Sequence, residues 1–145
     1  AGLNEGKHST SVGYNLRALQ QAASSLRERL STKLWNATRF ALMNGAHPGQ
    51  LPLHDELAAP ERWILSRLAH VTEEVNQDFD QFEFAKACDA LYHFAWDDVC
   101  DWYLEISKTA FAEGGPAAEQ VRVVLGHVLD QVLRLLLVLL GGEFS

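Results

Sequence analysis

Three polar residues follow one another at intervals of three along a helix-forming stretch. Lys33, Asn36 and Arg39 lie in the run KLWNATRFALMNG, which occupies residues 33–45. Lysine and arginine can hold phosphate groups, and an asparagine amide donates and accepts hydrogen bonds at once, as reading the edge of a base requires. The row therefore has two interpretations. It is either the solvated edge of a packed helix or a surface that binds a negatively charged partner.

Each of these residues also has a purely structural interpretation. Arg39 could pair with an acid of a later helix, and Asn36 could cap or cross-link buried backbone. Asp101 and Glu105 are expected to pair with basic groups of the first helix. The large aromatic residues are expected to fill the core, because the apolar stripes need large side chains; they are Trp35, Phe40, Trp63, Trp96 and Trp102.

The charges are unevenly distributed along the chain. The formal charge of −7 argues weakly against nucleic acid. Residues 16–44 nevertheless contain five basic residues and one acidic residue, whereas residues 73–105 contain ten acidic residues and one lysine. A polyanion would be attracted to the first segment and repelled by the second. The alternative is that the two oppositely charged helices attract each other within the molecule.

The sequence lacks the common catalytic and metal-binding signatures. The six histidines never fall three or four residues apart, so no helical metal-binding pair exists. Gly114 and Gly115 lack the Lys-Ser or Lys-Thr that follows in a phosphate-binding loop. His93 and Asp97 are four residues apart and are expected to form a structural hydrogen bond. We therefore expect no catalytic residue, no metal and no cofactor, and we expect that the chain alone is not an enzyme.

Four helices are predicted, because apolar residues recur every three or four positions and proline or glycine separates the periodic segments. The predicted helices span about residues 16–44, 60–78, 84–113 and 116–140. No alternating strand pattern occurs, so the predicted fold class is all-α, an antiparallel four-helix bundle. The third helix is expected to bury Phe84, Cys88, Leu91, Ala95, Val99, Trp102 and Ile106.

The length of 145 residues is enough for one domain with a substantial core. Residues 1–14 are interpreted as a flexible N-terminal segment and residues 15–140 as the helical bundle. Residues 141–145, with the sequence GGEFS, are interpreted as a tail added by cloning.

The last helix is apolar on nearly all sides from Leu133 to Leu140. Such a surface is either covered or left open for association, so we expect a homo-oligomer formed through Leu133–Leu140.

The longest apolar run is too short to cross a membrane. Cys88 and Cys100 are interpreted as reduced thiols of a cytoplasmic protein.

The sequence resembles the anticodon-binding helical domain of bacterial valyl-tRNA synthetases, which are class I aminoacyl-tRNA synthetases. The resemblance covers about residues 33–136 and keeps the family's order and spacing. It rests on KLWNATRFALMNG, on RWILSRL at residues 62–68, on FEFAKACDALYHFAWDDVCDWYLEISK at residues 82–108 and on VLGHVLDQVLRLL at residues 124–136.

The chain also departs from the family's pattern. Thr32 stands where the family has asparagine, and Leu137–Leu140 replaces a proline-containing turn. The segment Lys7–Gly13, KHSTSVG, faintly echoes the Lys-Met-Ser-Lys-Ser catalytic loop, with Thr10 in place of the second lysine.

What the resemblance implies is recognition of the anticodon stem-loop of a valine tRNA as part of valine–tRNA ligation, without the catalytic domain. The candidate RNA-binding residues are Arg29, Lys33, Asn36, Arg39, Arg62 and Arg67. The alternative is an engineered or divergent helical bundle that self-associates and no longer binds tRNA.

Overall fold

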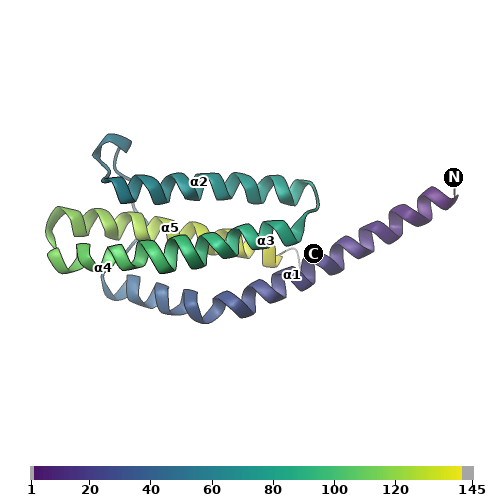
Figure 1. Ribbon diagram of the computed structural model, residues 1–145, viewed down its shortest axis with the longest axis horizontal. Helices are drawn as coiled ribbons and strands as arrows, with labels where there is room; N and C mark the ends of the chain where they lie inside the picture. Colours follow the sequence, from purple (N-terminus) through teal and green to yellow (C-terminus); the bar gives the residue numbers. More distant parts are fainter. Residues whose placement is uncertain (1, 142–145) are drawn as a thin grey trace.

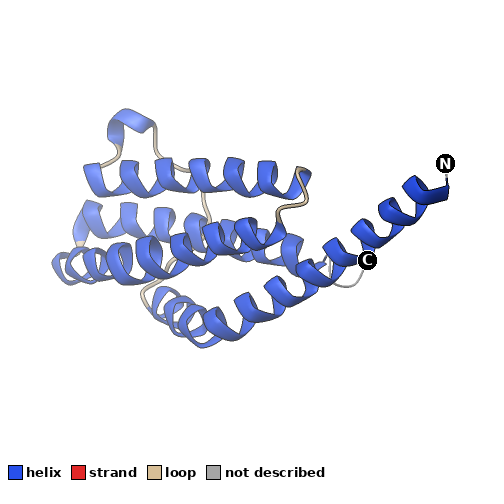
Figure 2. Ribbon diagram, turned by 45° about the vertical axis from the view of Figure 1, so that its right-hand side comes forward, coloured by secondary structure: helices blue, strands red, loops and turns tan. Residues whose placement is uncertain are grey.

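The computed structural model describes the backbone of residues 2–141 and the side-chain surroundings of residues 17–139. Its helices are α1 (Gly2–Met43), the short η1 (His54–Glu56), α2 (Ala59–Asp80), α3 (Phe84–His93), η2 (Phe94–Tyr103), α4 (Leu104–Glu113) and α5 (Gly115–Gly141). Helix η2 is a π-helix that joins α3 to α4 without a break, so the three form one long rod. The four rods alternate in direction (Figure 1) and, over the described residues, contain no strand (Figure 2). The predicted all-α antiparallel bundle is confirmed.

The ends of the chain differ in part from the prediction. The first rod begins at Gly2, well before the predicted start near residue 16. The side chains of residues 1–14 lie outside the described set, so the flexibility of this segment stays a prediction. The same holds for the proposed cloning tail, because residues 142–145 lie outside the described residues.

Local sequence explains where α1 ends. Gly45 has φ +80°, a left-handed conformation that is strained for residues with a side chain. The side-chain amide of Asn44 donates to the carbonyl of Phe40 at 2.9 Å and so satisfies one of the last carbonyls of the helix. The chain then leaves the helix for the loop that leads to α2, as the glycine predicted.

This loop packs tightly against α5. The backbone N–H of His47 donates to the carbonyl of Arg122 at 3.3 Å, and Nε of Arg122 donates to the carbonyl of Asn44 at 2.8 Å. A Cβ atom added to Gly126 would overlap the backbone of His47. Glycine at position 126 therefore lets the loop approach the helix, which fixes the exit of α1 relative to α5.

The core forms where the apolar stripes of the four rods meet. On α1, α2 and α5, apolar residues that recur every three or four positions, the pattern from which these helices were predicted, are buried. They include Leu19, Ala23, Leu26, Leu30, Leu34, Ala37 and Ala41 on α1, Ile64, Leu68, Val71 and Val75 on α2, and Val121, Leu125, Val128, Val132, Leu135 and Leu139 on α5.

The third rod follows its predicted stripe only as far as Val99. Beyond it Tyr103 and Ser107 are buried, whereas Trp102 and Ile106, which were predicted to be core residues, are partly exposed. The π-helix η2 holds more residues per turn than an α-helix, and it shifts the buried register by one position. The shift places the hydroxyl of Ser107, which donates to the carbonyl of Tyr103 at 2.7 Å, inside the bundle.

The shifted register also buries a polar pair. Tyr103 and Glu61 are both buried, and burial raises the pKa of the Glu61 carboxyl, while the nearby Tyr103 hydroxyl offsets part of that rise. Burial, together with the charge of Glu61, also raises the pKa of Tyr103. Among the described residues, Oε2 of Glu61 and the hydroxyl of Tyr103 are both buried without a hydrogen-bond partner, so this polar pair is close but not joined by a hydrogen bond.

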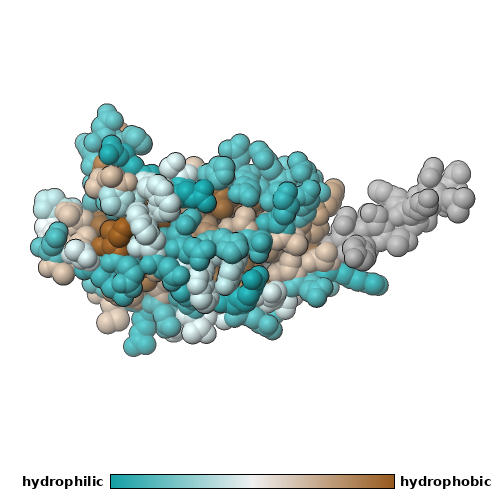
Figure 3. Space-filling view, in the orientation of Figure 1, coloured by the Kyte–Doolittle hydropathy of each residue, from teal (hydrophilic) through white to brown (hydrophobic). Residues whose placement is uncertain are grey.

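The surface seen in Figure 3 is mainly hydrophilic, with small apolar patches between polar side chains. Apolar side chains are also exposed on α5, at Leu133, Leu137 and Val138, with Leu137 68% exposed. Within the described residues, no helix combines the length and the apolar character needed to span a membrane.

Candidate nucleic-acid interface

The basic row of α1, which starts at Arg29 and continues through Lys33 to Arg39, lies beside the third rod. The two rods run next to each other along one side of the bundle (Figure 1). Arg29, Lys33, Asn36 and Phe40 are spaced by four, three and four residues, so they lie on one face of the helix. This face is about a quarter turn from the buried stripe. The row is therefore positioned at an edge between two rods.

Lys33 is engaged by the third rod. Its Nζ lies 2.6 Å from Oδ1 of Asp101 and 3.7 Å from the centre of the Trp96 ring, and its side chain is 27% exposed. Both contacts hold the ammonium group against the third rod. Asp101 thus pairs with the first helix as expected, and Lys33 is less available to a ligand than the sequence indicated.

Arg29 makes a looser contact one turn earlier. Its guanidinium carbon lies 4.2 Å from the centre of the Tyr92 ring, and the residue is exposed. Tyr92 stacks on Trp96, with 5.6 Å between ring centres. A cation above a ring keeps its N–H donors at the rim free, so Arg29 is held in place and can still bind an anion.

Asn36 and Arg39 are exposed. Among the described residues, neither side chain forms a hydrogen bond or an ion pair. Neither structural alternative, Arg39 paired with an acid or Asn36 bound to buried backbone, is found within residues 17–139. Two polar side chains with unused hydrogen-bonding groups remain next to each other on the outer side of α1.

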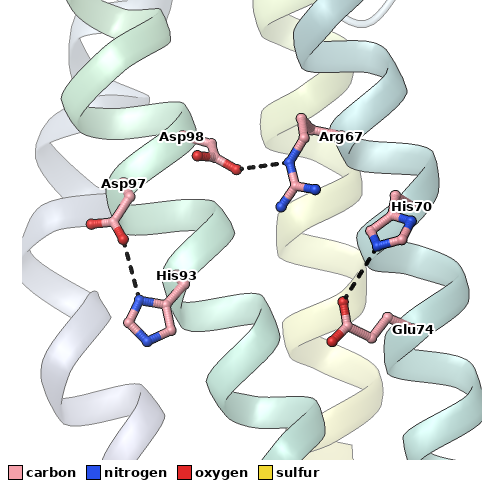
Figure 4. Close-up of polar contacts among 6 residues, drawn as sticks. All are labelled: Arg67, His70, Glu74, His93, Asp97 and Asp98. Carbon is pink, nitrogen blue, oxygen red and sulfur yellow. Dashed lines mark hydrogen bonds and ion pairs between the residues drawn. The ribbon is translucent and has the colours of Figure 1, made fainter.

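The two candidates on α2 lie on the far side of the third rod from α1 (Figure 1). Nε of Arg67 lies 3.3 Å from Oδ2 of Asp98 (Figure 4). Arg62 is exposed and has no ion-pair partner among the described residues. The structure therefore groups Arg29, Lys33, Asn36 and Arg39, and places Arg62 and Arg67 elsewhere.

The acids of the third rod are largely paired. Glu105 pairs with Lys108 of its own helix at 2.7 Å, so the expectation that it pairs with the first helix is wrong. The expected hydrogen bond between His93 and Asp97 is present, at 3.2 Å (Figure 4). Such pairing reduces the repulsion that these acids would exert on a polyanion at the neighbouring edge.

The expectation that the aromatic residues fill the core is wrong for three of them. Trp35 is 71% exposed, and Trp63 and Trp102 are 41% and 38% exposed. Trp96 packs on the core, and Phe40 is half-buried against Phe111, with 5.8 Å between ring centres. Phe40 lies one turn after Asn36 on the same face of α1. The spacing of four residues between them could have predicted from the sequence that Phe40 lies at this edge and not in the core.

The described residues contain no group of three or more His, Cys, Asp or Glu side chains that could hold a metal ion. Cys88 and Cys100 are free and buried, and burial raises the pKa of each thiol to about 11. Thiols with such pKa values are poor nucleophiles at neutral pH, so neither is suited to catalysis. What the arrangement offers is binding chemistry.

Comparisons with known proteins point to one family. The family model described as the anticodon-binding domain of tRNA ligase matches residues 61–140. The valine–tRNA ligase of Nocardia farcinica is 62% identical over 105 residues, which are 72% of this chain and 12% of that protein. The enzyme of Streptomyces coelicolor is 57% identical over 107 residues, 73% of this chain and 12% of that protein.

A third relative extends further along the chain. The valine–tRNA ligase of Mycobacterium tuberculosis H37Rv is 49% identical over 126 residues, 87% of this chain and 14% of that protein. The chain thus spans about an eighth of the length of these curated relatives. No solved structure matches it.

Proposed function

The chain belongs to the family of anticodon-binding domains of tRNA ligases, as the anticodon-binding domain of a bacterial valyl-tRNA synthetase, and on that premise we propose that it binds the anticodon stem-loop of a valine tRNA. The observation that supports this most is the exposure of Asn36 and Arg39, which are next to each other on α1 with their hydrogen-bonding groups unused by described neighbours.

The chemistry of this surface fits an RNA loop. Arg29 and Arg39 bind backbone phosphates, because guanidinium groups form paired hydrogen bonds with phosphate oxygens. Asn36 reads a base edge through its amide, which both donates and accepts. Lys33, held by Asp101 and Trp96, adds positive charge beside Asn36. Arg62 and Arg67 are secondary candidates, because they lie on the other side of the third rod.

The function proposed for this chain is to bind tRNA, not to join valine to it. The relatives are ligases, and this chain covers 12–14% of three of them. We propose that the chain alone does not ligate valine to tRNA, that it needs no cofactor to bind RNA and that it acts in the cytoplasm. An aminoacylation assay with the chain alone, ATP, valine and tRNA is expected to give no product above background.

Fluorescence anisotropy with labelled tRNA tests the proposal. The chain is titrated with valine tRNA, with a non-cognate tRNA and with valine tRNA carrying the non-cognate anticodon, all at one salt concentration. We expect the two tRNAs with a foreign anticodon to bind at least about tenfold more weakly, as loss of base contacts would cause. Equal binding of all three would contradict recognition of the anticodon.

A second candidate function is self-association, and the exposed apolar side chains of α5 favour it. Leu133, Leu137 and Val138 are exposed, and Trp35 of α1 is exposed beside a groove lined by Leu133 and Leu136. We propose a homo-oligomer formed through this surface, in the range Leu133–Leu140. Analytical ultracentrifugation over a range of concentrations tests it, and a strict monomer at high concentration would contradict it.

A further inference from the structure

Two tryptophans from neighbouring rods meet at the surface on the α2 side of the third rod. The ring centres of Trp63 on α2 and Trp102 on η2 are 4.4 Å apart, with 61° between the ring planes. Both residues are about two-fifths exposed, at 41% and 38%. Together with Ala59, Pro60 and Asp98 they line a surface cavity of about 610 Å³. The cavity is large enough for a flat aromatic ligand.

The π-helix explains why Trp102 is part of this cavity. The apolar spacing of the third rod predicts that Trp102 follows Val99 into the core. Helix η2 shifts the register by one residue, so Tyr103 takes the core position and Trp102 lies against Trp63. Such π-helical segments occur often at functional sites. The exposed aromatic pair is thus a consequence of local backbone geometry.

A fixed carboxylate lies at the edge of the aromatic pair. Oδ2 of Asp98 accepts a hydrogen bond from Nε of Arg67, and Figure 4 shows the two side chains reaching toward each other from the third rod and α2. Oδ1 of Asp98 has no hydrogen-bond partner among the described residues. The cavity therefore combines flat apolar walls, an acceptor with spare lone pairs and a neighbouring cation.

We propose that this cavity binds a guanine base. The base stacks on the exposed face of the Trp102 indole and meets the Trp63 ring at an angle, its N1–H and N2–H donate to the carboxylate of Asp98, and its phosphate lies within the field of Arg67. Guanine is the common base that presents two adjacent N–H donors on one edge, which matches the two oxygens of a carboxylate. The site lies on the other side of the third rod from α1, so it is separate from the α1 surface proposed to bind the anticodon.

NMR titration of the whole chain with guanosine monophosphate tests the proposal. The chain has four tryptophans, and their indole N–H signals are assigned with single Trp→Phe variants. We expect saturable shifts of the Trp63 and Trp102 signals, with the Trp35 and Trp96 signals unchanged. Inosine monophosphate lacks only the N2 amino group, and it is expected to bind about tenfold more weakly, because it loses one hydrogen bond to a charged acceptor.

Two variants and a control test the roles of the residues. Trp102→Ala is expected to weaken guanosine monophosphate binding by about tenfold or more, as loss of a stacking partner does. Asp98→Asn is expected to bring guanosine and inosine monophosphate to within about twofold of each other, since it removes an acceptor oxygen. Trp35→Ala, an equally large truncation at an exposed tryptophan on α1, is expected to leave binding unchanged.

A short single-stranded RNA with one guanine identifies the source of the base. Binding at least about tenfold tighter than that of the mononucleotide would indicate an RNA ligand, and equal binding would indicate a free guanine nucleotide. Either result supports the site. The proposal is overturned if millimolar guanosine monophosphate shifts neither the Trp63 nor the Trp102 signal, or if the wild-type chain binds guanosine and inosine monophosphate equally. The comparison of guanosine with inosine monophosphate uses the unaltered chain alone, so it does not depend on whether the variants fold.

Discussion

The ammonium group of Lys33 lies 2.6 Å from Oδ1 of Asp101 and 3.7 Å from the centre of the Trp96 ring. Asp101 and Trp96 are five residues apart on η2, and π-helical winding keeps residues at this spacing close to one side of the helix. The two contacts join α1 to the third rod at the middle of the basic row. Lys33 therefore has a structural role in the free protein, next to the side chains proposed to bind RNA.

Replacing Asp101 with asparagine should release Lys33. The change removes one negative charge from the edge and frees one cation, so we expect tRNA affinity to rise several-fold at low salt. The pair is partly exposed, and the loss of stability should stay below about 1 kcal/mol. Anisotropy titration and urea unfolding measure the two effects.

Asp130→Asn is the matched control for this change. Asp130 holds Arg134 on α5 at 2.8 Å, so its replacement also removes one carboxylate and frees one cation. We expect a much smaller change in tRNA affinity from this variant. If both variants strengthen binding equally, the effect comes from total charge and not from the edge between α1 and the third rod.

The sequence predicted the bundle because the stripes of α1, α2 and α5 have an unbroken helical period. It failed on the third rod beyond Val99, since single-sequence periodicity assumes α-helical winding, and a π-helix changes the period without a proline or glycine to mark it. The misplacement of Trp102 has this cause. The positions of Tyr103 and Ser107 in the core follow from the same shift.

The candidate site was predicted only in part. The spacing of Lys33, Asn36 and Arg39 placed them on the exposed side of α1, and the structure has two of the three exposed. The acid that pairs with Lys33 is determined by how α1 and the third rod pack side by side. The spacing of apolar residues does not predict this packing. The spacing of Trp35 predicts that it is exposed, because it lies outside the apolar stripe of Leu34, Ala37 and Ala41. Its large side chain nevertheless favoured the prediction of a core position.

Gly126→Ala should destabilise the bundle. The added Cβ would overlap the backbone of His47, so either the loop or α5 must move, and the hydrogen bond from His47 N–H to the Arg122 carbonyl would be strained. We expect a loss of about 2 kcal/mol or more in the free energy of unfolding, measured by urea denaturation. Gly114→Ala tests φ strain alone, because nothing lies near its Cβ, and should cost less. If Gly126→Ala left the free energy of unfolding unchanged, the overlap with His47 would be relieved without cost, contrary to this prediction.

Stability should fall at alkaline pH through the two buried thiols. Burial raises the pKa of Cys88 and Cys100 from 9.0 to about 11, so the folded state keeps protons that the unfolded state loses above pH 9. The stabilisation is fully present below that pH and is lost as the pH rises toward 11. Urea unfolding at intervals across this range should show the decline.

A Cys88→Ala, Cys100→Ala double variant serves as the comparison. Its stability should fall less steeply between pH 9 and 11 than that of the unaltered chain. Some decline should remain, because burial also raises the pKa of Tyr103. Parallel pH profiles for the two proteins would contradict a contribution from the thiols.

Leu137→Glu should abolish self-association if the α5 surface forms the oligomer. Leu137 is 68% exposed, so the substitution adds a charge to the surface without disturbing the core. We expect a monomer by sedimentation with unchanged helix content. Leu53→Glu, at a similarly exposed leucine in the loop before α2, should leave association unchanged. Monomerisation by both variants would place the interface elsewhere or indicate a general charge effect.

Binding of RNA at the α1 surface is tested most directly by the tRNA affinity of an Asn36→Ala, Arg39→Ala double variant, compared with that of Arg134→Ala on α5. Loss of Arg39 should lower the slope of log affinity against log salt by about 1, and loss of both side chains should weaken valine tRNA binding by about tenfold or more. Arg134→Ala should change neither strongly. If the double variant binds valine tRNA with the affinity and salt dependence of the unaltered chain, the α1 surface is not where the RNA binds.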